Sequence, residues 1–595
     1  MSRIAGGPRV RAMLAESGPG EAWVEGELGW VGAGPANAHR EDGLAVVVDG
    51  TVYAPAVRAG EPAAALVARL YREHGFAEAL RRLNFDGAIA LRDGDTLWLG
   101  RDRFGVRPLF HLADGSAFAS RPRALLTLPG VPRAPRRSFV ARFAASHYRT
   151  FDNDRTASPY EAIDQLPAGH LLRVAPGKPP LREAWWALEE APDLDGAPDE
   201  LAERYRELLL DAVGIRLAAA GRPAFTLSGG MDSSSVLASA VSLSGERQHA
   251  YSTVYAHAEY DESDEIRSML DLAVAGWHQV PIGNRPDVVG LVEQMVAAHD
   301  EPVATATWLS HHVLCGVVAE AGFDTLFGGL GGDELNAGEY EYFFFNFADL
   351  RAAGREAQLR EEVEAWVRHH DHPIFRKSRD AMEAGLARTV DLHTPGRILP
   401  DRARIERYDA ALAPGFYDLR TFDPVMDRVF ASYLRNRTYQ DLFRETAPCC
   451  LRAEDRQTHA AGLRNCDPFF DHRLAELMFR VPGELKIHEG VTKQLLRRAT
   501  RGLLPEETRT RIKKTGWNAP ADNWFSGPGR DLLHDVVGSA AFDRGIYDLT
   551  EVRRLIDEHD EIVRSGRPAE NHMMFLWQLV NLDVWLRWLD ALPQP

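Results

Sequence analysis

The stretch Phe225–Leu237, FTLSGGMDSSSVL, sets small residues and hydroxyl groups between two apolar segments. The segment PAFTL (223–227) predicts a short buried strand, and SSVLASAVSL (234–243) predicts an apolar helix. The loop between them consists of Ser228, Gly229, Gly230, Met231, Asp232 and Ser233. Glycines let backbone N–H groups gather around an anion, and the N-terminus of the following helix adds a favourable dipole. The stretch therefore predicts a strand, an anion-binding loop and a helix.

Two interpretations of this loop are open from the residues alone. It could be an ordinary strand–helix turn whose Ser and Asp residues cap the helix. It could also hold phosphate groups, with serine hydroxyls donating to phosphate oxygens and Asp232 serving as a Mg²⁺ ligand between phosphates. The sequence contains no GxxxxGK segment, so a Walker P-loop is excluded.

The run Ser-Gly-Gly-x-Asp-Ser at the end of a strand resembles the pyrophosphate loop of the N-type ATP pyrophosphatases, which split ATP between its α- and β-phosphates. Two further segments resemble the asparagine synthetase family. FDTLFGGLGGDEL (323–335) is similar to its Ser-Gly-Glu-Gly-Ser-Asp-Glu loop, and RTRIKKTGWNAPADNW (509–524) to its Arg-x-Lys-x-Gly-Phe segment. The resemblance implies ATP and Mg²⁺ as cofactors. The residues that it implies for ATP binding are Leu227, Ser228, Gly229, Gly230, Asp232, Ser233, Ser234, Val254, Gly328 and Gly329.

Three charged residues are implied to be catalytic by the same resemblance. Asp232 and Asp333 fall on the two carboxylates that hold Mg²⁺ in the family. Lys513 falls on the lysine that neutralises the α-phosphate and the leaving pyrophosphate, and Lys514 competes for that role because the spacing has one extra residue. Taken in isolation, an acidic pair at a helix start and a lysine pair on a turn would be solvated surface groups.

Residues 1–187 are predicted to consist of strands with turns and few long helices. GLAVVVDGTVYA (43–54) predicts a hairpin with an Asp-Gly turn, and FDGAIALRDGDTLWLGRD (85–102) repeats that pattern. PAAALVARLYREHG (62–75) predicts a helix that stops at a glycine. We therefore expect a sheet-rich domain of sandwich or layered type.

This part of the chain resembles the N-terminal glutaminase domain of the asparagine synthetase family. The segments that carry the resemblance are RDRFGVRPLFH (101–111), FDGAIALRD (85–93) and LPAGHLLRV (166–174). It implies an Ntn-hydrolase-like layered domain, and together with the loops above it spans nearly the whole chain.

The residues implied to hydrolyse glutamine depart from the family pattern. The family uses a cysteine after the first methionine as its nucleophile, whereas this chain has Ser2, whose hydroxyl is far less ionised than a thiol at neutral pH. Arg3 replaces a glycine, Asp49-Gly50 replaces Asn-Gly, and RAGEPAAA (58–65) replaces an acidic cluster. We expect an inactive glutaminase domain that serves as a scaffold; a serine-based amidase or an alternative start is the other interpretation.

The resemblance implies that ATP activates a carboxylate as an acyl-adenylate, which an amine then attacks to form an amide. In asparagine synthetases the loop position occupied here by Leu330 is a glutamate, and in β-lactam-forming relatives it is a tyrosine. Leucine can neither take a proton nor bind an ammonium ion. Arg464 likewise replaces a family glutamate. These changes weigh against plain asparagine formation from glutamine.

The leading hypothesis is an AMP-forming amide ligase that joins a small-molecule or peptide carboxylate to an amine without using glutamine. The amine could belong to the substrate itself, as in lasso-peptide cyclases and β-lactam synthetases, or to another molecule in specialised-metabolite synthesis. An asparagine synthetase that uses ammonia or glutamine is the second hypothesis. The third is a pseudoenzyme that binds ATP without chemistry.

Composition sets outer bounds on function. The 69 basic and 86 acidic side chains leave a net charge of −17, which makes nucleic acid a poor default partner. No apolar run approaches the length of a membrane helix, and no signal-peptide core is present. The four cysteines, which form no CxxC pair, suit a cytoplasmic protein. They are Cys315, Cys449, Cys450 and Cys466. A homodimer is a possible assembly.

The polar, Pro-rich segment LEEAPDLDGAPDE (188–200) is the best candidate for a linker. It divides the chain into a glutaminase-like domain, 1–187, and an ATP-pyrophosphatase synthetase domain, 201–595. For the latter we expect an α/β fold of the adenine-nucleotide α-hydrolase type, with a parallel sheet and many helices. NAGEYEYFFFNFADL (336–350) could be a core helix or could line an enlarged acceptor pocket.

Overall fold

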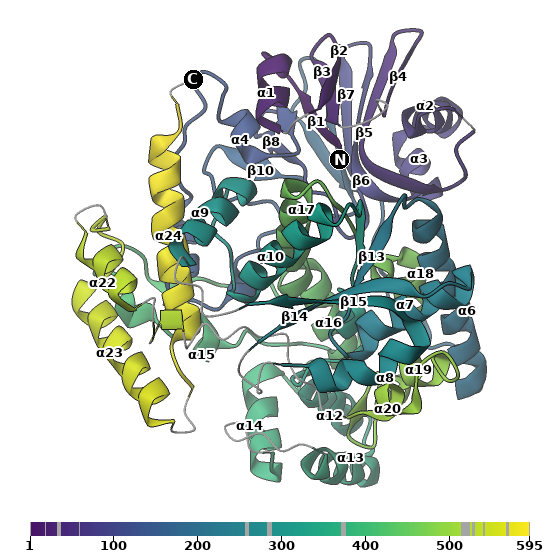
Figure 1. Ribbon diagram of the computed structural model, residues 1–595, viewed down its shortest axis with the longest axis vertical. Coiled ribbons are helices and arrows are strands. Elements are labelled where there is room, and N and C mark those ends of the chain that lie inside the picture. The colour runs from purple at the N-terminus through teal and green to yellow at the C-terminus, as the bar shows by residue number, and fades with distance from the viewer. Residues whose placement is uncertain are drawn as a thin grey trace.

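In its described residues, the computed structural model contains two six-stranded antiparallel sheets, one five-stranded parallel sheet, one two-stranded antiparallel sheet and many surrounding helices (Figure 1). The six-stranded sheets, built from the N-terminal part of the chain, lie at one end of the molecule, and the parallel sheet crosses its middle. The residues that the structure describes are 2–17, 20–32, 37–58, 60–255, 261–282, 288–369, 377–512, 524–525, 527, 530–539, 542–566 and 570–593.

Two six-stranded antiparallel sheets form the N-terminal part of the fold. The first has the order β10-β8-β9-β1-β3-β2 and the second the order β12-β11-β7-β6-β5-β4. The strands of the first sheet are β1 (Ser2–Gly6), β2 (Glu21–Glu25), β3 (Leu28–Gly32), β8 (Phe110–Leu112), β9 (Phe118–Ala119) and β10 (Ile163–Gln165). Those of the second are β4 (Ala38–Glu41), β5 (Leu44–Ala54), β6 (Asn84–Asp93), β7 (Thr96–Arg101), β11 (His170–Val174) and β12 (Leu181–Ala184).

Successive side chains along these strands point to opposite faces of a sheet, so each sheet packs on the other sheet with one face and on helices with the other. Ile4, Val47 and Leu99 belong to a buried cluster that draws on both sheets, whereas Val46 and Val48 on the other face of β5 pack toward helices. The helices of this part are α1 (Val10–Ser17), α2 (Ala63–His74), α3 (Phe76–Arg82), α4 (Pro122–Leu125) and α5 (Arg137–Ala145). The layered, β-rich arrangement that the sequence predicts is confirmed, and α2 stops at the predicted glycine, Gly75.

The hairpin predicted over 43–54 is wrong, because Asp49 and Gly50 lie in the middle of a continuous strand, β5. Gly50 pairs with Gly87 of β6, at a φ of 126°, and a Cβ on Gly50 would lie 2.1 Å from the Asp86 carbonyl oxygen. Asp49 is buried and accepts a hydrogen bond from the Ser120 hydroxyl. Burial and cross-strand pairing therefore override the local turn preference. The second predicted hairpin is confirmed, since β6 and β7 are joined at 94–95.

The parallel sheet has the order β15-β14-β13-β16-β17, with every neighbouring pair parallel. The chain runs from β13 outward through β14 to β15, and then returns to the other side of β13 with β16. The loops after β13 and β16 therefore flank the switch point, where open α/β sheets bind ligands. The strands are β13 (Pro223–Thr226), β14 (Gln248–Val254), β15 (Val274–Pro281), β16 (Thr325–Phe327) and β17 (Arg464–Cys466).

Helices cover both faces of this sheet, as the sequence predicts for an α/β fold. α6, α7 and α8 lie on one side, and α10 and α17 on the other (Figure 1). Helix α7 begins three residues before the predicted start, at Met231, so the second half of the glycine loop already belongs to its first turn. The bounds are α6 (Pro198–Ala218), α7 (Met231–Ser244), α8 (Ser263–Ala273), α10 (Thr307–Glu320) and α17 (Thr446–Ala460).

The remaining helices fill the space around the parallel sheet. Helix α12 is buried along nearly its whole length, so the interpretation of 336–350 as a core segment is confirmed for the part that α12 contains. The longer ones are α9 (Val288–His299), α12 (Tyr342–Ala352), α13 (Glu356–Arg368), α14 (Arg379–Thr389), α16 (Tyr433–Phe443), α22 (Arg530–Gly538), α23 (Leu549–Ser565) and α24 (Met573–Ala591). The shorter ones include α11 (Gly332–Asn336), α18 (His472–Met478), α19 (Gln494–Ala499) and α20 (Glu506–Thr510).

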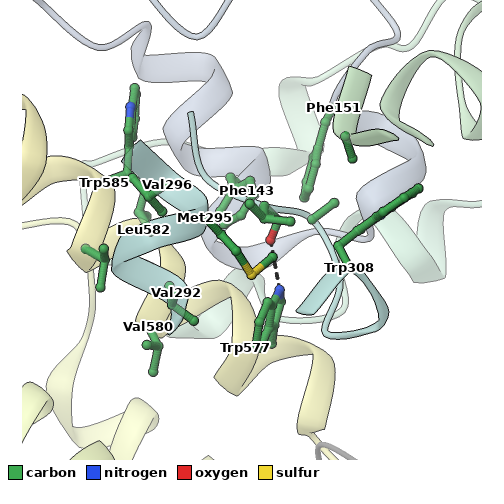
Figure 2. Packing of buried hydrophobic residues seen from close by; sticks show 14 of the residues in the cluster. Phe143, Phe151, Val292, Met295, Val296, Trp308, Trp577, Val580, Leu582 and Trp585 are labelled. Atoms are coloured by element: carbon green, nitrogen blue, oxygen red, sulfur yellow. Dashed lines mark hydrogen bonds between the residues drawn. The ribbon is translucent and has the colours of Figure 1, made fainter. Parts of the chain in front are cut away.

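The last helix ties the two parts of the chain together. Figure 2 shows Trp577 of α24, Met295 of α9 and Phe143 of α5, which belong to one buried cluster although α5 is in the N-terminal part. The Trp577 indole N–H donates to the Val303 carbonyl oxygen over 2.8 Å. The core of the synthetase part is therefore continuous with that of the N-terminal part.

The predicted linker is packed along the protein. Leu188 is buried, and the Leu194 backbone N–H donates to the Arg480 carbonyl oxygen over 2.8 Å. The division into 1–187, 188–200 and 201–595 stays a proposal. Among the described residues, no helix is long and apolar enough to cross a bilayer.

Candidate active site

The loop after β13 has the geometry of an anion cradle. Gly229 has a φ of 70°, which favours glycine, and Gly230 is the N-cap of α7. The Ser228 backbone N–H donates to the Ser233 hydroxyl over 3.3 Å, and the two serine hydroxyls lie 3.1 Å apart. The Ser234 hydroxyl is fully buried and has no partner among the described residues, so it is available to a phosphate oxygen. These features fit a phosphate group at the start of α7.

The loop after β16 lies directly against the first loop. A Cβ on Gly329 would lie 2.6 Å from the Ser233 backbone nitrogen, and a Cβ on Gly332 would lie 2.4 Å from the Asp232 Cγ. Such contacts leave room only for glycine at both positions. The sequence LFGGLGGDEL therefore uses its glycines to bring two loop backbones together at the switch point.

Asp232 and Asp333 converge on one cation, the Lys493 ammonium group. Lys493 Nζ lies 2.5 Å from Asp232 Oδ2 and 2.7 Å from Asp333 Oδ1. The lysine is buried and has a φ of 60°, which is uncommon for a residue with a side chain. It follows a short hairpin of β18 (Ile487–His488) and β19 (Val491–Thr492).

The two carboxylates fit a Mg²⁺ ion. Their oxygens lie close enough to bind the same positive charge, and Mg²⁺ usually takes one or two protein carboxylates together with phosphate oxygens and water. Within the described residues, no group of three or more His, Cys, Asp and Glu side chains is arranged to hold a metal. Asp232 and Asp333 would therefore hold the ion together with ATP phosphates.

The segment that carries the predicted catalytic lysine reaches the same loop. The Arg511 guanidinium donates to the Gly229 carbonyl oxygen over 2.9 Å and to the Glu265 carbonyl oxygen over 3.2 Å. Lys513 and Lys514 lie outside the described residues. Their roles stay predictions.

The predicted adenine-side residues lie at neighbouring strand ends. The Leu227 backbone N–H donates to the Tyr251 carbonyl oxygen over 3.0 Å, and the Ser252 hydroxyl donates to the Leu227 carbonyl oxygen over 2.5 Å. Val254 is the last residue of β14 and is partly exposed. Leu227 and Val254 thus border the carboxyl edge of the sheet beside the cradle.

In the second loop, Leu330 departs from the family pattern, whereas Glu334 keeps it. Leu330 is half-buried and packs against the apolar core beneath the sheet. Burial, followed by the charge of Asp333, raises the pKa of the Glu334 carboxyl to about 8. The leucine supplies no acceptor for an amine at this position.

Sequence reasoning missed Lys493. It stands at the start of KQLLRRATRGLLP (493–505), where the sequence indicates only a helix. A lysine just before an amphipathic helix is ordinary in sequence terms. Its role becomes visible only when the fold brings it to two aspartates that lie 160 and 261 positions earlier in the chain.

At the N-terminal end of the chain, Arg3 occupies the space beside β1. Its side chain is 1% exposed, donates to both Asp455 oxygens over 3.2 and 3.0 Å, and lies 3.6 Å from the Asp49 carboxylate. Arg107 pairs with the same Asp455. Ser2 is the first residue of β1, and its side chain lies outside the described part of the structure.

A parallel sheet with two glycine loops at its switch point, and two carboxylates converging between them, are features of an α/β protein of the open-sheet class, in which ligands bind at this edge. The sequence model described as "Asparagine synthase" matches residues 204–587, and that described as "Glutamine amidotransferase domain" matches 61–186. The chain belongs to the asparagine synthase family. It is thereby a member of a family of ATP-dependent amidotransferases, which are C–N ligases.

Several relatives match most of the chain. A protein of Mycobacterium tuberculosis (strain ATCC 25618 / H37Rv) with the provisional name asparagine synthetase (glutamine-hydrolyzing) is 26% identical, over 86% of this chain and 78% of its own. Asparagine synthetase (glutamine-hydrolyzing) 1 of Bacillus subtilis (strain 168) is 23% identical, over 87% and 80%. Amidase chry2 of Gibberella zeae is 24% identical, over 80% and 75%.

Two solved structures align with less than half of the chain. They are an allosteric regulatory enzyme of purine biosynthesis and the glutamine phosphoribosylpyrophosphate amidotransferase of B. subtilis. Their identities are 10% and 11%, each covers 47% of this chain and 80% or 81% of its own, and both TM-scores are 0.22.

Proposed function

We propose that the protein uses ATP to convert a carboxylate into an acyl-adenylate and then joins the acyl group to an amine, releasing AMP. The observation that carries the proposal is the convergence of Asp232 and Asp333 on a single cation where the two glycine loops touch. A triphosphate seated on the first loop would present its phosphates to both carboxylates.

In the first step, a substrate carboxylate oxygen forms a bond to the α-phosphorus of ATP, and the bond to the bridging oxygen breaks, so pyrophosphate leaves. Loop N–H groups and the Ser234 hydroxyl orient the phosphates, and Lys493 supplies positive charge beside them. A bound Mg²⁺ would neutralise phosphate charge between Asp232 and Asp333. In the second step, the amine nitrogen bonds to the acyl carbon and AMP leaves with the electrons of the broken C–O bond.

We further propose that glutamine is not the nitrogen source. The chain has Ser2 where the family nucleophile is a cysteine, and Arg3 fills the adjacent space with a buried guanidinium held by Asp455 and Asp49. A glutamine site at β1 would have to displace this ion pair, which costs several kcal/mol, about 3–5, when one partner is lost. The N-terminal part then serves as a scaffold.

Asparagine synthesis from ammonia is the second candidate function. It is favoured by the names of relatives that match most of the chain. Leu330 counts against it, because it replaces the glutamate next to the incoming ammonia. Another relative that matches most of the chain is named as an amidase, so the names within the family are not confined to asparagine synthesis.

Product analysis tests the proposal. With ATP, Mg²⁺, ammonium and a panel of amino and peptide acids, we expect AMP and pyrophosphate to form in equal amounts, and glutamine to release no glutamate. Formation of ADP and phosphate would contradict acyl-adenylate chemistry. ATP binding without any product would favour the pseudoenzyme, and steady glutamate release would contradict the inactive glutaminase.

A further inference from the structure

Two buried carboxyl groups face the backbone of the second glycine loop from its far side. Glu454 comes from α17, and Asp467 directly follows β17. A Cβ on Gly328 would lie 2.6 Å from Asp467 Oδ1 and 3.3 Å from Glu454 Oε1. The absence of a side chain at Gly328 therefore leaves both carboxyl groups next to the loop.

The two carboxyl groups interact strongly with each other. Glu454 is 7% exposed and Asp467 is 2% exposed, and they lie within hydrogen-bond reach. Burial, followed by the charge of Asp467, raises the pKa of Glu454 well above its usual range, and burial raises the pKa of Asp467 to about 6. At neutral pH such a pair holds one proton and one negative charge.

The surroundings of the pair offer acceptors rather than donors. Glu454 Oε2, Asp467 Oδ1 and the Asn465 side-chain oxygen have no donor among the described residues, and all three residues are more than nine-tenths buried. The Asn465 amide lies 3.5 Å from the other Asp467 oxygen, which joins the three groups into one cluster. Three buried acceptors with one negative charge match a ligand that carries several N–H donors.

A neighbouring histidine is held in its neutral form. This residue is His311, whose ring Nδ1 lies 2.6 Å from Gln457 Oε1. Because the Gln457 side-chain NH₂ donates to the Trp308 carbonyl oxygen, its Oε1 is the acceptor, and Nδ1 of His311 carries the proton. Nε2 of His311, which lies 3.8 Å from Glu454 Oε1 and 3.8 Å from the Cys315 sulfur, is then unprotonated. Burial lowers the pKa of His311 to about 4, so the ring supplies no positive charge to the pair.

The position of the cluster links it to the nucleotide loops. Gly328 contacts the carboxyl pair, and the next residue, Gly329, contacts the Ser233 backbone and Asp232. Two consecutive residues of the second glycine loop therefore border the acceptor cluster and the ATP cradle. Leu330 follows them in the same loop and has no side-chain group able to bind an amine.

We propose that Glu454 and Asp467 bind the amine substrate and take its proton before it attacks the acyl-adenylate. The inference rests on the proposed function and names its amine site. A protonated amine gives one proton to the ionised carboxyl group of the pair and becomes a nucleophile. The nitrogen then bonds to the acyl carbon, and the bond between that carbon and the phosphate oxygen breaks. The second proton of the amine leaves on the phosphate of AMP.

The test compares Glu454→Gln and Asp467→Asn with the parent and with Glu484→Gln, an exposed glutamate that pairs with Arg355. Each protein is supplied with an acid that supports ATP–pyrophosphate exchange in the parent. Three rates are measured: exchange, amide formation from ammonium, and hydroxamate formation from hydroxylamine, which is largely unprotonated at neutral pH.

We expect both variants to keep exchange and hydroxamate formation within about threefold, and to lose amide formation from ammonium by about 100-fold. The control should keep all three. Amide formation within about threefold of the parent in a folded variant would overturn the proposal, and so would a parallel loss of all three rates. If one variant does not fold, the other decides. An absence of exchange in the parent would instead contradict the proposed function.

Discussion

At the scale of single residues, the site is a balance of charge between Lys493 and two aspartates. Each carboxylate lies within 2.7 Å of the same ammonium nitrogen, and the lysine is only 6% exposed. Removing a partner from a buried ion pair leaves an uncompensated charge, which is costly. The same arrangement would let Mg²⁺ and phosphates enter with little change in net local charge.

Replacing the lysine should therefore affect both stability and catalysis. In Lys493→Met, Asp232 and Asp333 would face each other without a cation. We expect the variant to have a lower melting temperature than the parent in the absence of Mg²⁺. Added Mg²⁺ should raise the melting temperature of the variant more than that of the parent. The rate of ATP–pyrophosphate exchange should fall about 100-fold. Calorimetry with and without Mg²⁺ measures the first effect. An equal Mg²⁺ response in variant and parent would show that the aspartates do not share a cation.

Replacing Asp467 should have the opposite effect to replacing Lys493 and should stabilise the folded protein. The pKa of Asp467 is raised in the folded state, so the folded protein binds more protons than the unfolded chain between pH about 4 and about 6, and stability falls as the pH rises through that window. The charged groups around it are Glu454, Asp86 and Arg216.

Asp467→Asn removes the free-energy cost of ionising this buried carboxyl group. We therefore expect the gain in the free energy of unfolding, variant minus parent, to be about 2 kcal/mol larger at pH about 8 than at pH about 4. Urea unfolding at both pH values measures the difference. A difference that does not change with pH would contradict a raised pKa. A gain in stability together with loss of amide formation would mark Asp467 as a functional residue.

The residue types at the cradle could be predicted from sequence, whereas their partners could not. Ser228, Asp232 and Asp333 stand in short motifs whose spacing limits what they can do. Lys493 stands just before a helix and Glu454 stands within one, and neither belongs to a short motif. Their environment depends on which helix lies against which loop, and that is fixed by packing over hundreds of residues.

At the scale of elements, the decisive feature is the contact between the loop after β13 and the loop after β16. Backbone meets backbone where Gly329 lies against Ser233 and where Gly332 lies against Asp232. Glycine at both positions lets the aspartates approach each other. The predicted strand and helix around FTLSGGMDSSSVL are confirmed, and Phe225 of the strand and Leu237 of the helix belong to the same buried cluster. The predicted turn at Asp49–Gly50 failed because pairing with β6 outweighs the turn preference of that dipeptide.

A methyl group at this contact should separate the loops. We expect Gly329→Ala to weaken ATP binding by about tenfold or more, because its Cβ would lie 2.6 Å from the Ser233 backbone nitrogen, closer than van der Waals contact allows. Gly316→Ala is the matched control, since it lies in α10 and a Cβ there meets nothing within 4 Å. Isothermal titration with a non-hydrolysable ATP analogue gives both affinities. Equal affinities would show that the close approach of the loops is not needed for binding.

At the scale of the whole molecule, buried ion pairs connect the N-terminal sheets to the synthetase part. Asp455 of α17 accepts from Arg3 of β1 and from Arg107. Burial alone would raise the pKa of Asp455, but Arg3 and Arg107 outweigh it and hold that pKa well below its usual range. Together with the α24 core in Figure 2, this makes the N-terminal part a structural support for α17. The expected homodimer stays a prediction.

Neutralising Asp455 should destabilise the whole protein. Asp455→Asn leaves two buried guanidinium groups without their carboxylate, so we expect a loss of about 3–5 kcal/mol in the free energy of unfolding at neutral pH. Because the pKa is lowered, the contribution of this carboxylate is present at neutral pH and is lost only as the pH falls well below about 4. Asp199→Asn, an exposed partner of Arg498, is the control and should change little. Equal stability of the two variants would contradict the role of the ion pair.

The most direct test of the central claim is Mg²⁺-dependent exchange of labelled pyrophosphate into ATP, over a panel of carboxylic acids that includes aspartate. We predict exchange that requires one class of acid, that needs no glutamine, and that disappears in Asp232→Asn and Asp333→Asn. No exchange with any acid, although ATP binds, would contradict adenylation. Unchanged exchange in both aspartate variants would contradict the site described between the two glycine loops.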